Sequence, residues 1–291
     1  MTTALTLSAI QYTALDGGIP ANTAEHIRLI EDADDRGARL VVFPELSLTG
    51  YDLRGLADPQ RWVTAEDARL DGLREICRRT GITAVVGAPF READGTPRLA
   101  SLALHPSGGL KTGFKVWPQG QERRLFRAGG QGGQAVILDL DGWRIALAIC
   151  LDAARPVHAG EAAEAGADVY AVSAHCAGED QRLALHLGAR VMDNRMFGVL
   201  ANLGGTTGGG PSAGGSGLWG PDGTGDPSCG RHRDRSADRD PDLQRPGLPR
   251  PGLPRPGLPR PGPPRPGPPR PEPLRPGIPR TGRWMRRRDP A

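Results

Sequence analysis

The feature that most limits the fold of this chain is a repeat near its C-terminus. After the stretch GSGLWGPDGT the sequence becomes RPGLPRPGLPRPGLPRPGPPRPGPPRP, a repeat of Arg, Pro, Gly and Leu with a period of five residues. Proline has no backbone N–H, and the repeat has almost no apolar bulk to bury, so this part cannot build a packed core. Glycine recurs at every fifth position, whereas collagen needs it at every third. We therefore expect a folded domain over residues 1–224 and a disordered tail of polyproline II character over residues 225–291.

Charge divides at the same place. Nineteen of the 29 prolines follow residue 224, and residues 225–291 carry 16 arginines against 7 acidic residues, a net charge of +9. Since the whole chain has a net charge of +4, residues 1–224 have a net charge of −5. The basic character belongs to the tail, so we expect no nucleic-acid partner for the folded part. The tail is either solvated without a function, or a PxxP ligand or polyanion-binding arm.

Cysteine spacing and the N-terminus bear on location. Cys77, Cys150, Cys176 and Cys229 form no CxxC pair and no disulfide-dense pattern, which suits a reducing compartment. The opening MTTALTLSAIQY has neither the basic start of a signal peptide nor the length of a membrane span. We expect a cytoplasmic protein that does not enter a membrane.

The six histidines show no HExxH or similar spacing, so no metal site and no cofactor are predicted.

Apolar runs alternate with helical patterns through the first part of the chain. Strands are predicted at LTLSAIQY, ARLVVFPE, ITAVVGAPF, LASLALHP, ADVYAVSA and FGVLANL, and a hairpin at QAVILDLDGWRIALAIC, turning at Asp141-Gly142. Helices are expected between Asn22 and Gly37, from a cap at Thr64 and Asp67 to Arg79, after Pro156, and near 180–194. Because the strand runs are apolar on both faces, the pattern predicts an α/β sandwich with two sheets inside and helices outside.

Three short segments carry candidate chemistry. Glu45 follows the buried strand that ends in VVFP, at the rim of a sheet. Lys115 stands between Phe114 and Trp117, which favours partial desolvation, and Cys150 ends the apolar strand RIALAI. Taken singly, each residue has a common structural explanation: a solvated glutamate, a solvated lysine and a small core cysteine. Only their combination points to a catalytic site.

In this order the segments resemble the carbon–nitrogen hydrolase (nitrilase) superfamily, whose members use a Glu–Lys–Cys triad. FPELSLTGY resembles the segment around the family's catalytic glutamate, KVWPQGQERRLFRAG its lysine block, and AICLDAARP its nucleophile block. The resemblance covers residues 5 to about 224. It implies a four-layer α-β-β-α sandwich in which Glu45, Lys115 and Cys150 are catalytic.

The residue types suit hydrolysis of an amide. A cysteine thiol has a pKa near 8.5 and needs a base, a role that the resemblance gives to Glu45. Lys115 and the backbone N–H of Leu151 are expected to hold the oxyanion that forms when a thiol attacks an amide carbonyl. Glu122 is expected to orient these groups or the substrate nitrogen. The substrate pocket is expected to be lined by Tyr51, Trp117, His175 and Cys176.

The residues after the nucleophile favour one branch of the family. Nitrilases tend to have Trp-Glu there, whereas this chain has Leu151-Asp152, closer to the amidase-type branches. We therefore expect cleavage of a small amide or N-carbamoyl compound rather than a nitrile, through a cysteine thioester, with release of ammonia or an amine. Trp117, Pro118, Ala128 and Ala154 depart from the commoner family residues, so the specificity stays open.

The C-terminus motivates a different hypothesis. The family continues with two more strands and a segment that helps it to form homodimers, whereas GDPSCGRHRDRSADRD shows no strand pattern. We expect these C-terminal strands to be lost, a homodimer to be weakened and the domain to be poorly stable; a shifted reading frame after about Thr224 is one explanation. The alternative function is therefore a catalytically defective relative that acts as a binding module, or a non-functional truncated product.

Overall fold

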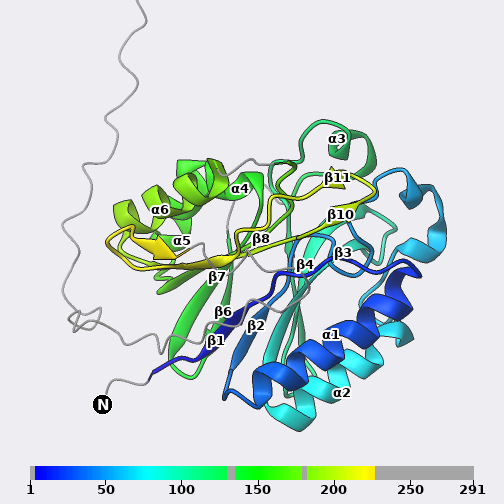
Figure 1. Cartoon of the computed structure of the whole chain (residues 1–291), viewed down its shortest axis with the longest axis horizontal. Helices are drawn as coiled ribbons and strands as arrows, with labels where there is room; N and C mark the ends of the chain where they lie inside the picture. The colour runs from blue at the N-terminus through cyan, green and yellow to red at the C-terminus, as the bar shows by residue number, and fades with distance from the viewer. Residues whose placement is uncertain (1–3, 130–134, 179–181, 227–291) are drawn as a thin grey trace, which may run out of the picture. The chain divides into compact units, whose positions relative to one another are not determined.

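The computed structural model describes residues 4–129, 135–178 and 182–226. In this part of the chain two β-sheets lie face to face, and helices cover the outer face of each sheet (Figure 1). The predicted α/β class and the α-β-β-α order of layers are confirmed. The tail predicted from residue 225 onward lies outside the described residues, except for Gly225 and Asp226.

The first sheet has five strands in the order of the sequence, with β1, β2 and β3 parallel and β4 and β5 antiparallel to their neighbours. Its strands are β1 (Leu7–Ala9), β2 (Leu40–Val42), β3 (Thr83–Arg91), β4 (Pro97–Leu104) and β5 (Leu110–Phe114). Two helices cover its outer face, α1 (Gly18–Asp34) and α2 (Asp71–Thr80), at the lower right of Figure 1.

The second sheet has six strands in the order β13-β12-β9-β8-β7-β6, and its central strands β7, β8 and β9 are parallel. Its strands are β6 (Val136–Leu140), β7 (Trp143–Ile149), β8 (Val169–Ala174), β9 (Phe197–Asn202), β12 (Gly217–Trp219) and β13 (Gly225–Asp226). Its outer helices are α4 (Leu151–Ala154), α5 (Pro156–Glu164) and α6 (Arg182–Asn194). The short helix α3 (Glu122–Leu125) and the two-stranded ribbon of β10 (Thr206–Thr207) and β11 (Gly210–Pro211) lie beside one end of the sheets (Figure 1).

The central strands of both sheets bury both of their faces. In β2, Val41 packs toward the helices while its neighbours Leu40 and Val42 pack between the sheets. In β7, Ile145 and Leu147 face the other sheet, and Ala146 and Ala148 face α5 and α6. The core therefore has three apolar layers: one between the sheets, and one between each sheet and its outer helices. Burial on both faces explains why these strands have continuous apolar sequences.

The first helix begins earlier than its sequence signals predict. Helix α1 starts at Gly18, and Asn22 lies inside it with its side chain buried. The Asn22 amide accepts a hydrogen bond from Leu15 N at 2.8 Å and donates to Leu15 O at 3.1 Å. The predicted cap at Asn22 is therefore wrong, because this side chain closes the loop before the helix. The predicted end is close, since Gly37 has a φ of 78° three residues after Asp34.

Five short strands were not predicted: β10, β11 and β12, which lie between residues 206 and 219, and the two described next. The segment Leu110–Phe114 forms β5, a short edge strand that pairs with β4. The segment Gly225–Asp226 forms β13 and pairs with β12, so the chain continues the second sheet just past the predicted end of strand structure. The hairpin at Asp141-Gly142 is confirmed: both residues have positive φ, 48° and 82°, as a two-residue turn requires.

Candidate active site

Glu45 lies in a tight loop that follows β2 and packs on β3. The Ser47 hydroxyl accepts a hydrogen bond from Gly87 N, and Leu48 N donates to Gly87 O, both at 2.9 Å. A Cβ atom at Gly87 would lie 2.3 Å from Pro44 O, so only glycine permits this close approach. The loop holds Glu45 at the end of the sheet with 1% of its surface exposed.

Lys115 directly follows β5 and joins two carboxylates. Its Nζ donates to Glu45 Oε1 at 2.7 Å and to Glu122 Oε1 at 2.8 Å. All three side chains are fully buried. Glu122 begins α3, and its carboxylate also accepts from the Tyr51 hydroxyl at 2.5 Å and from Gln119 N at 2.7 Å. One cation thus holds together two acids that are 77 positions apart in the sequence.

Cys150 lies at a strained turn between β7 and α4. Its φ of 48° and ψ of −103° are unusual for a residue with a side chain, a conformation that typically costs about 1–3 kcal/mol. Its Sγ donates to His175 O at 3.6 Å, and His175 N in turn donates to Glu45 Oε2 at 3.0 Å. The residue after β8 therefore contacts both the thiol and the carboxylate.

Asp152 ties the nucleophile turn to the lysine segment. Its buried carboxylate accepts from Trp117 N at 3.0 Å and from Val116 N at 3.2 Å. The other oxygen accepts from Ile149 N at 3.2 Å, within the strand that leads to Cys150. Since Val116 directly follows Lys115, this one side chain fixes the spacing between the ammonium group and the thiol.

His175 and Cys176 form one wall of the cluster. The His175 ring stacks on Tyr51 with the ring centres 4.1 Å apart, and its Nδ1 lies 2.9 Å from Ser212 Oγ. Cys176 N donates to Asn202 Oδ1 at 3.0 Å. Burial lowers the pKa of His175 to about 4, so its ring is neutral near neutral pH. The wall is thus built from β8, β9 and the β11 segment.

Burial and neighbouring charges shift the pKa values of the three central groups. Burial raises the pKa of Glu45 well above its usual value, although the charge of Lys115 works against this shift. A hydrogen bond with the Cys176 thiol, together with burial, raises the pKa of Cys150. Burial disfavours the charged form of Lys115, but Glu45, Cys150 and Glu122 outweigh it and raise the pKa of the ammonium group. The resting site therefore contains a thiol rather than a thiolate, beside a cation.

Most of the residues predicted for the site lie together. Contacts link Glu45, Lys115, Glu122, Cys150, Tyr51, His175 and Cys176. Leu151 is the first residue of α4, where a backbone N–H has no acceptor within its own helix. Trp117 lies elsewhere: its ring packs edge-on against His158 with the ring centres 5.9 Å apart, so its contacts do not support the predicted pocket role.

Two residues of the cluster were not given a role from the sequence. Asp152 stands in the nucleophile segment, but its partners are backbone groups of another segment, which no spacing reveals. Ser212 lies in a glycine-rich stretch and touches the site through the His175 ring. Within the described ranges, no group of three or more His, Cys, Asp or Glu residues is arranged to hold a metal ion. In the same residues, no helix has the length and apolarity needed to cross a membrane.

The fold and the cluster define a layered α/β protein with a buried cysteine, glutamate and lysine at one end of its sheets. The sequence profile of the carbon-nitrogen hydrolase family matches residues 6–233, and the chain belongs to that family. The resemblance in the three sequence segments is thereby confirmed.

Solved structures of an amidase from Nesterenkonia sp. AN1 are similar to this chain. A Cys-to-Ala mutant in complex with butyramide is 28% identical, with a TM-score of 0.69, and the match covers 76% of this chain and 85% of that one. A Glu-to-Gln mutant of the same amidase carries the acetamide moiety of fluoroacetamide at its active-site cysteine; it is 28% identical, with a TM-score of 0.69, and the match covers 76% and 84% of the two chains.

Curated relatives match at similar identity. A nitrilase from Pyrococcus abyssi is 28% identical over 185 residues, which are 62% of this chain and 68% of the relative. A glutamine-dependent NAD(+) synthetase from Mycobacterium bovis is 33% identical over 186 residues, but the match spans only 27% of that protein.

Proposed function

We propose that this protein hydrolyses a small amide through a thioester on Cys150. The observation that carries the proposal is the buried Lys115 ammonium group, bonded to both Glu45 and Glu122 beside the Cys150 thiol. A cation and two acids are costly to bury together unless they serve a function or are fully paired. Their position next to a thiol at a strained turn favours a nucleophilic site.

Glu45 acts as the general base of the proposed reaction. An ordinary glutamate is a weak base for a thiol, because its pKa lies several units below that of cysteine. Burial raises the pKa of Glu45, which makes this carboxylate a stronger base than an ordinary glutamate. As Cys150 Sγ attacks the amide carbon, Glu45 takes the thiol proton and then gives it to the departing ammonia. It next takes a proton from water, which attacks the thioester and releases the carboxylic acid.

Lys115 and Leu151 supply the donors for the oxyanion. The ammonium group has three N–H bonds and uses two of them on Glu45 and Glu122, so one remains for the substrate oxygen. The N–H of Leu151 directly follows the nucleophile, at the start of α4. A good donor of this kind typically stabilises the transition state by about 3–4 kcal/mol. Glu122 keeps the ammonium group in place and accepts the Tyr51 hydroxyl.

A short aliphatic amide is the proposed substrate class. The similar amidase has been solved with butyramide, and this chain has Leu151-Asp152 after the cysteine. The stacked rings of Tyr51 and His175 form an apolar wall beside the thiol, and the neutral His175 ring adds no charge. An uncharged amide therefore fits better than an anionic one beside two carboxylates.

The test is release of ammonia from butyramide by the full-length chain. Wild type should release ammonia and Cys150→Ala should not, while Cys77→Ala serves as the matched control because Cys77 is buried in α2 within a different core layer. Mass spectrometry of the intact chain, quenched during turnover, should show the butyryl group on wild type and Cys77→Ala only. Equal ammonia release by wild type and Cys150→Ala would refute the proposal. Turnover of butyronitrile in preference to butyramide would move the chain to the nitrilase class.

A further inference from the structure

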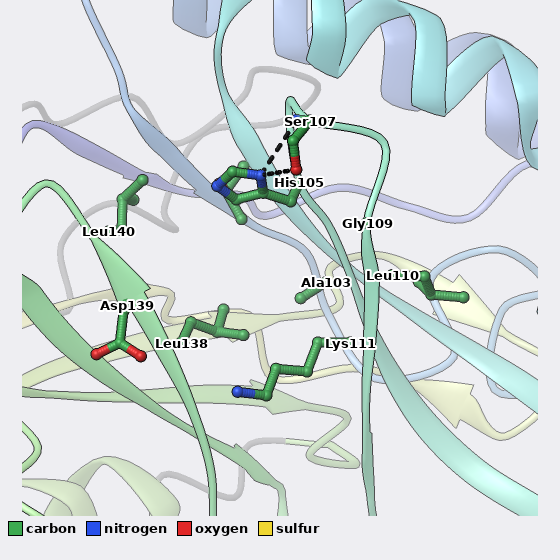
Figure 2. Close-up of a pocket in the computed structure, with 10 residues that line it drawn as sticks. Ala103, His105, Ser107, Gly109, Leu110, Lys111, Leu138, Asp139 and Leu140 are labelled. Atoms are coloured by element: carbon green, nitrogen blue, oxygen red, sulfur yellow. Dashed lines mark hydrogen bonds between the residues drawn. The ribbon is translucent and has the colours of Figure 1, made fainter.

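A pocket opens at the end of the two sheets that lies opposite the Cys150 cluster. It has a volume of about 330 Å³ and lies between the β4–β5 turn and strand β6 (Figure 2). Thr83, the first residue of β3, lines it and pairs in register with Leu40, the first residue of β2. Glu45 follows the opposite end of β2, so the pocket is separate from the Cys150 cluster. Its volume falls in the range of sites that bind small molecules.

The polar side chains that face this pocket offer hydrogen-bond donors. Thr83 is 3% exposed, and no group in the described part of the chain pairs with its hydroxyl. His105 Nδ1 accepts from Ser107 N at 3.1 Å, which places the proton of the neutral ring on Nε2. Lys111 Nζ donates to Ile137 O at 2.6 Å and keeps two further N–H bonds. A buried hydroxyl without a partner is costly, and a ligand oxygen would satisfy it.

Apolar side chains form the rest of the wall. Ala103, Leu138 and Leu140 belong to the core layer between the sheets and, although 2–7% exposed, line the pocket at the end of that layer. Figure 2 shows Lys111 extending from β5 toward Leu138, with the His105–Ser107 pair on the other side. Asp139 is the one acid among the described residues of the pocket. It lies between Leu138 and Leu140 in β6, so its side chain points to the opposite face of the strand, and its Oδ1 lies 3.5 Å from Arg144 Nε.

We propose that this pocket binds a small carboxylate with a short apolar tail. Donors on several sides of the pocket, one of them the charged Lys111, favour an anionic oxygen acceptor, and the leucine wall favours an aliphatic tail. At about 30 Å³ for each water-sized group, the volume holds roughly ten such groups, enough for a chain of several carbons. The proposal does not depend on the reaction at Cys150.

The probe is hexanoate, with hexan-1-ol as its uncharged counterpart, and binding to the full-length chain is followed by saturation-transfer NMR. Hexanoate should bind saturably and at least about tenfold more tightly than hexan-1-ol, as expected for a charge-assisted contact. Thr83→Val and Lys111→Met should each weaken hexanoate binding about tenfold. The matched controls are Thr112→Val, on the same edge strand as Lys111, and Arg54→Met, which removes one exposed positive charge elsewhere; neither should change the affinity.

Further readouts locate the bound probe. Thr83→Val removes an unpaired buried hydroxyl, so its melting temperature should equal or exceed that of wild type, and a loss of binding then reflects the site and not unfolding. In Cys150→Ala, excess butyramide should leave hexanoate bound. No saturable binding, equal binding of hexan-1-ol, unchanged affinity in both Thr83→Val and Lys111→Met, or displacement by butyramide would each overturn the proposal.

Discussion

Replacing Asp152 with asparagine separates the hydrogen bonds of this side chain from its charge. The carboxylate accepts from three backbone N–H groups, those of Val116, Trp117 and Ile149. Asparagine has one acceptor oxygen in place of two, so in either orientation its NH₂ group faces a backbone N–H. At least one buried N–H therefore loses its partner, which costs about 1–3 kcal/mol.

The negative charge of Asp152 lowers the stability of the fold, whereas its hydrogen bonds raise it. Burial raises the pKa of this carboxyl from 3.8 to about 6, so the folded chain binds the proton of Asp152 more tightly than the unfolded chain does. Stability from a raised pKa is fully present below the unfolded value and is lost as the pH rises through the folded value. A shift of this size corresponds to about 3 kcal/mol, lost between about pH 4 and pH 6. Asparagine does not titrate, so the variant lacks this loss.

The assay is urea unfolding of wild type and Asp152→Asn across the pH range. Relative to wild type, the free energy of unfolding of the variant should improve by roughly 2–3 kcal/mol from pH 4 to pH 8. Asp193→Asn, at an exposed position in α6, is the matched control and should show no such change. Turnover of butyramide by Asp152→Asn should fall roughly 10–100-fold, because the segment of Lys115 loses its tether. A pH-independent difference in stability would refute the pKa argument, and unchanged turnover would refute the tether.

Four further experiments test the cluster and its support. Glu45→Gln cannot accept the thiol proton, so turnover should fall about 10²–10⁴-fold with little change in melting temperature, and wild-type turnover would contradict the base role. Because burial raises the pKa of Glu45, kcat/KM of wild type should rise with pH through a limb above pH 4.5, and a profile flat down to pH 4 would speak against this. Lys115→Ala should lower kcat more than it raises KM; a higher KM with unchanged kcat would make Lys115 a substrate-binding group. Gly87→Ala should destabilise the fold by about 1–3 kcal/mol, since its Cβ would lie 2.3 Å from Pro44 O, whereas Gly160→Ala in α5 meets nothing within 4 Å and should stabilise it by about 0.5–1 kcal/mol; equal melting temperatures would refute the packing argument.

The layers of the fold could be predicted because burial on both faces leaves a clear trace in the strand sequences. The start of α1 could not be predicted, because Asn22 matches a common cap signal but its side chain bonds to Leu15, seven residues earlier in the preceding loop. Strand β5 escaped prediction because Leu110–Phe114 is a short edge strand with a lysine and a glycine in it. In both cases the deciding partner is a neighbouring segment that local propensity does not describe.

The candidate site was predictable to the extent that its residues stand in recognisable segments. Glu45 and Cys150 each end or follow a buried strand, and the ordered resemblance of the three segments adds Lys115 to them. Trp117 was assigned to the pocket by its nearness to Lys115 in sequence, but the backbone bonds to Asp152 place it on the side of His158. A contact of this kind joins a side chain to the main chain of a remote segment, so no residue pattern encodes it.

The backbone at Cys150 sets stability against function. A residue with a Cβ is strained at a φ of 48° and ψ of −103°, and glycine would relieve that strain at the cost of the thiol. In a lineage where the thiol had no use, drift toward glycine at this position would therefore be favoured by folding alone. This sequence keeps a cysteine at a turn where folding alone would favour glycine.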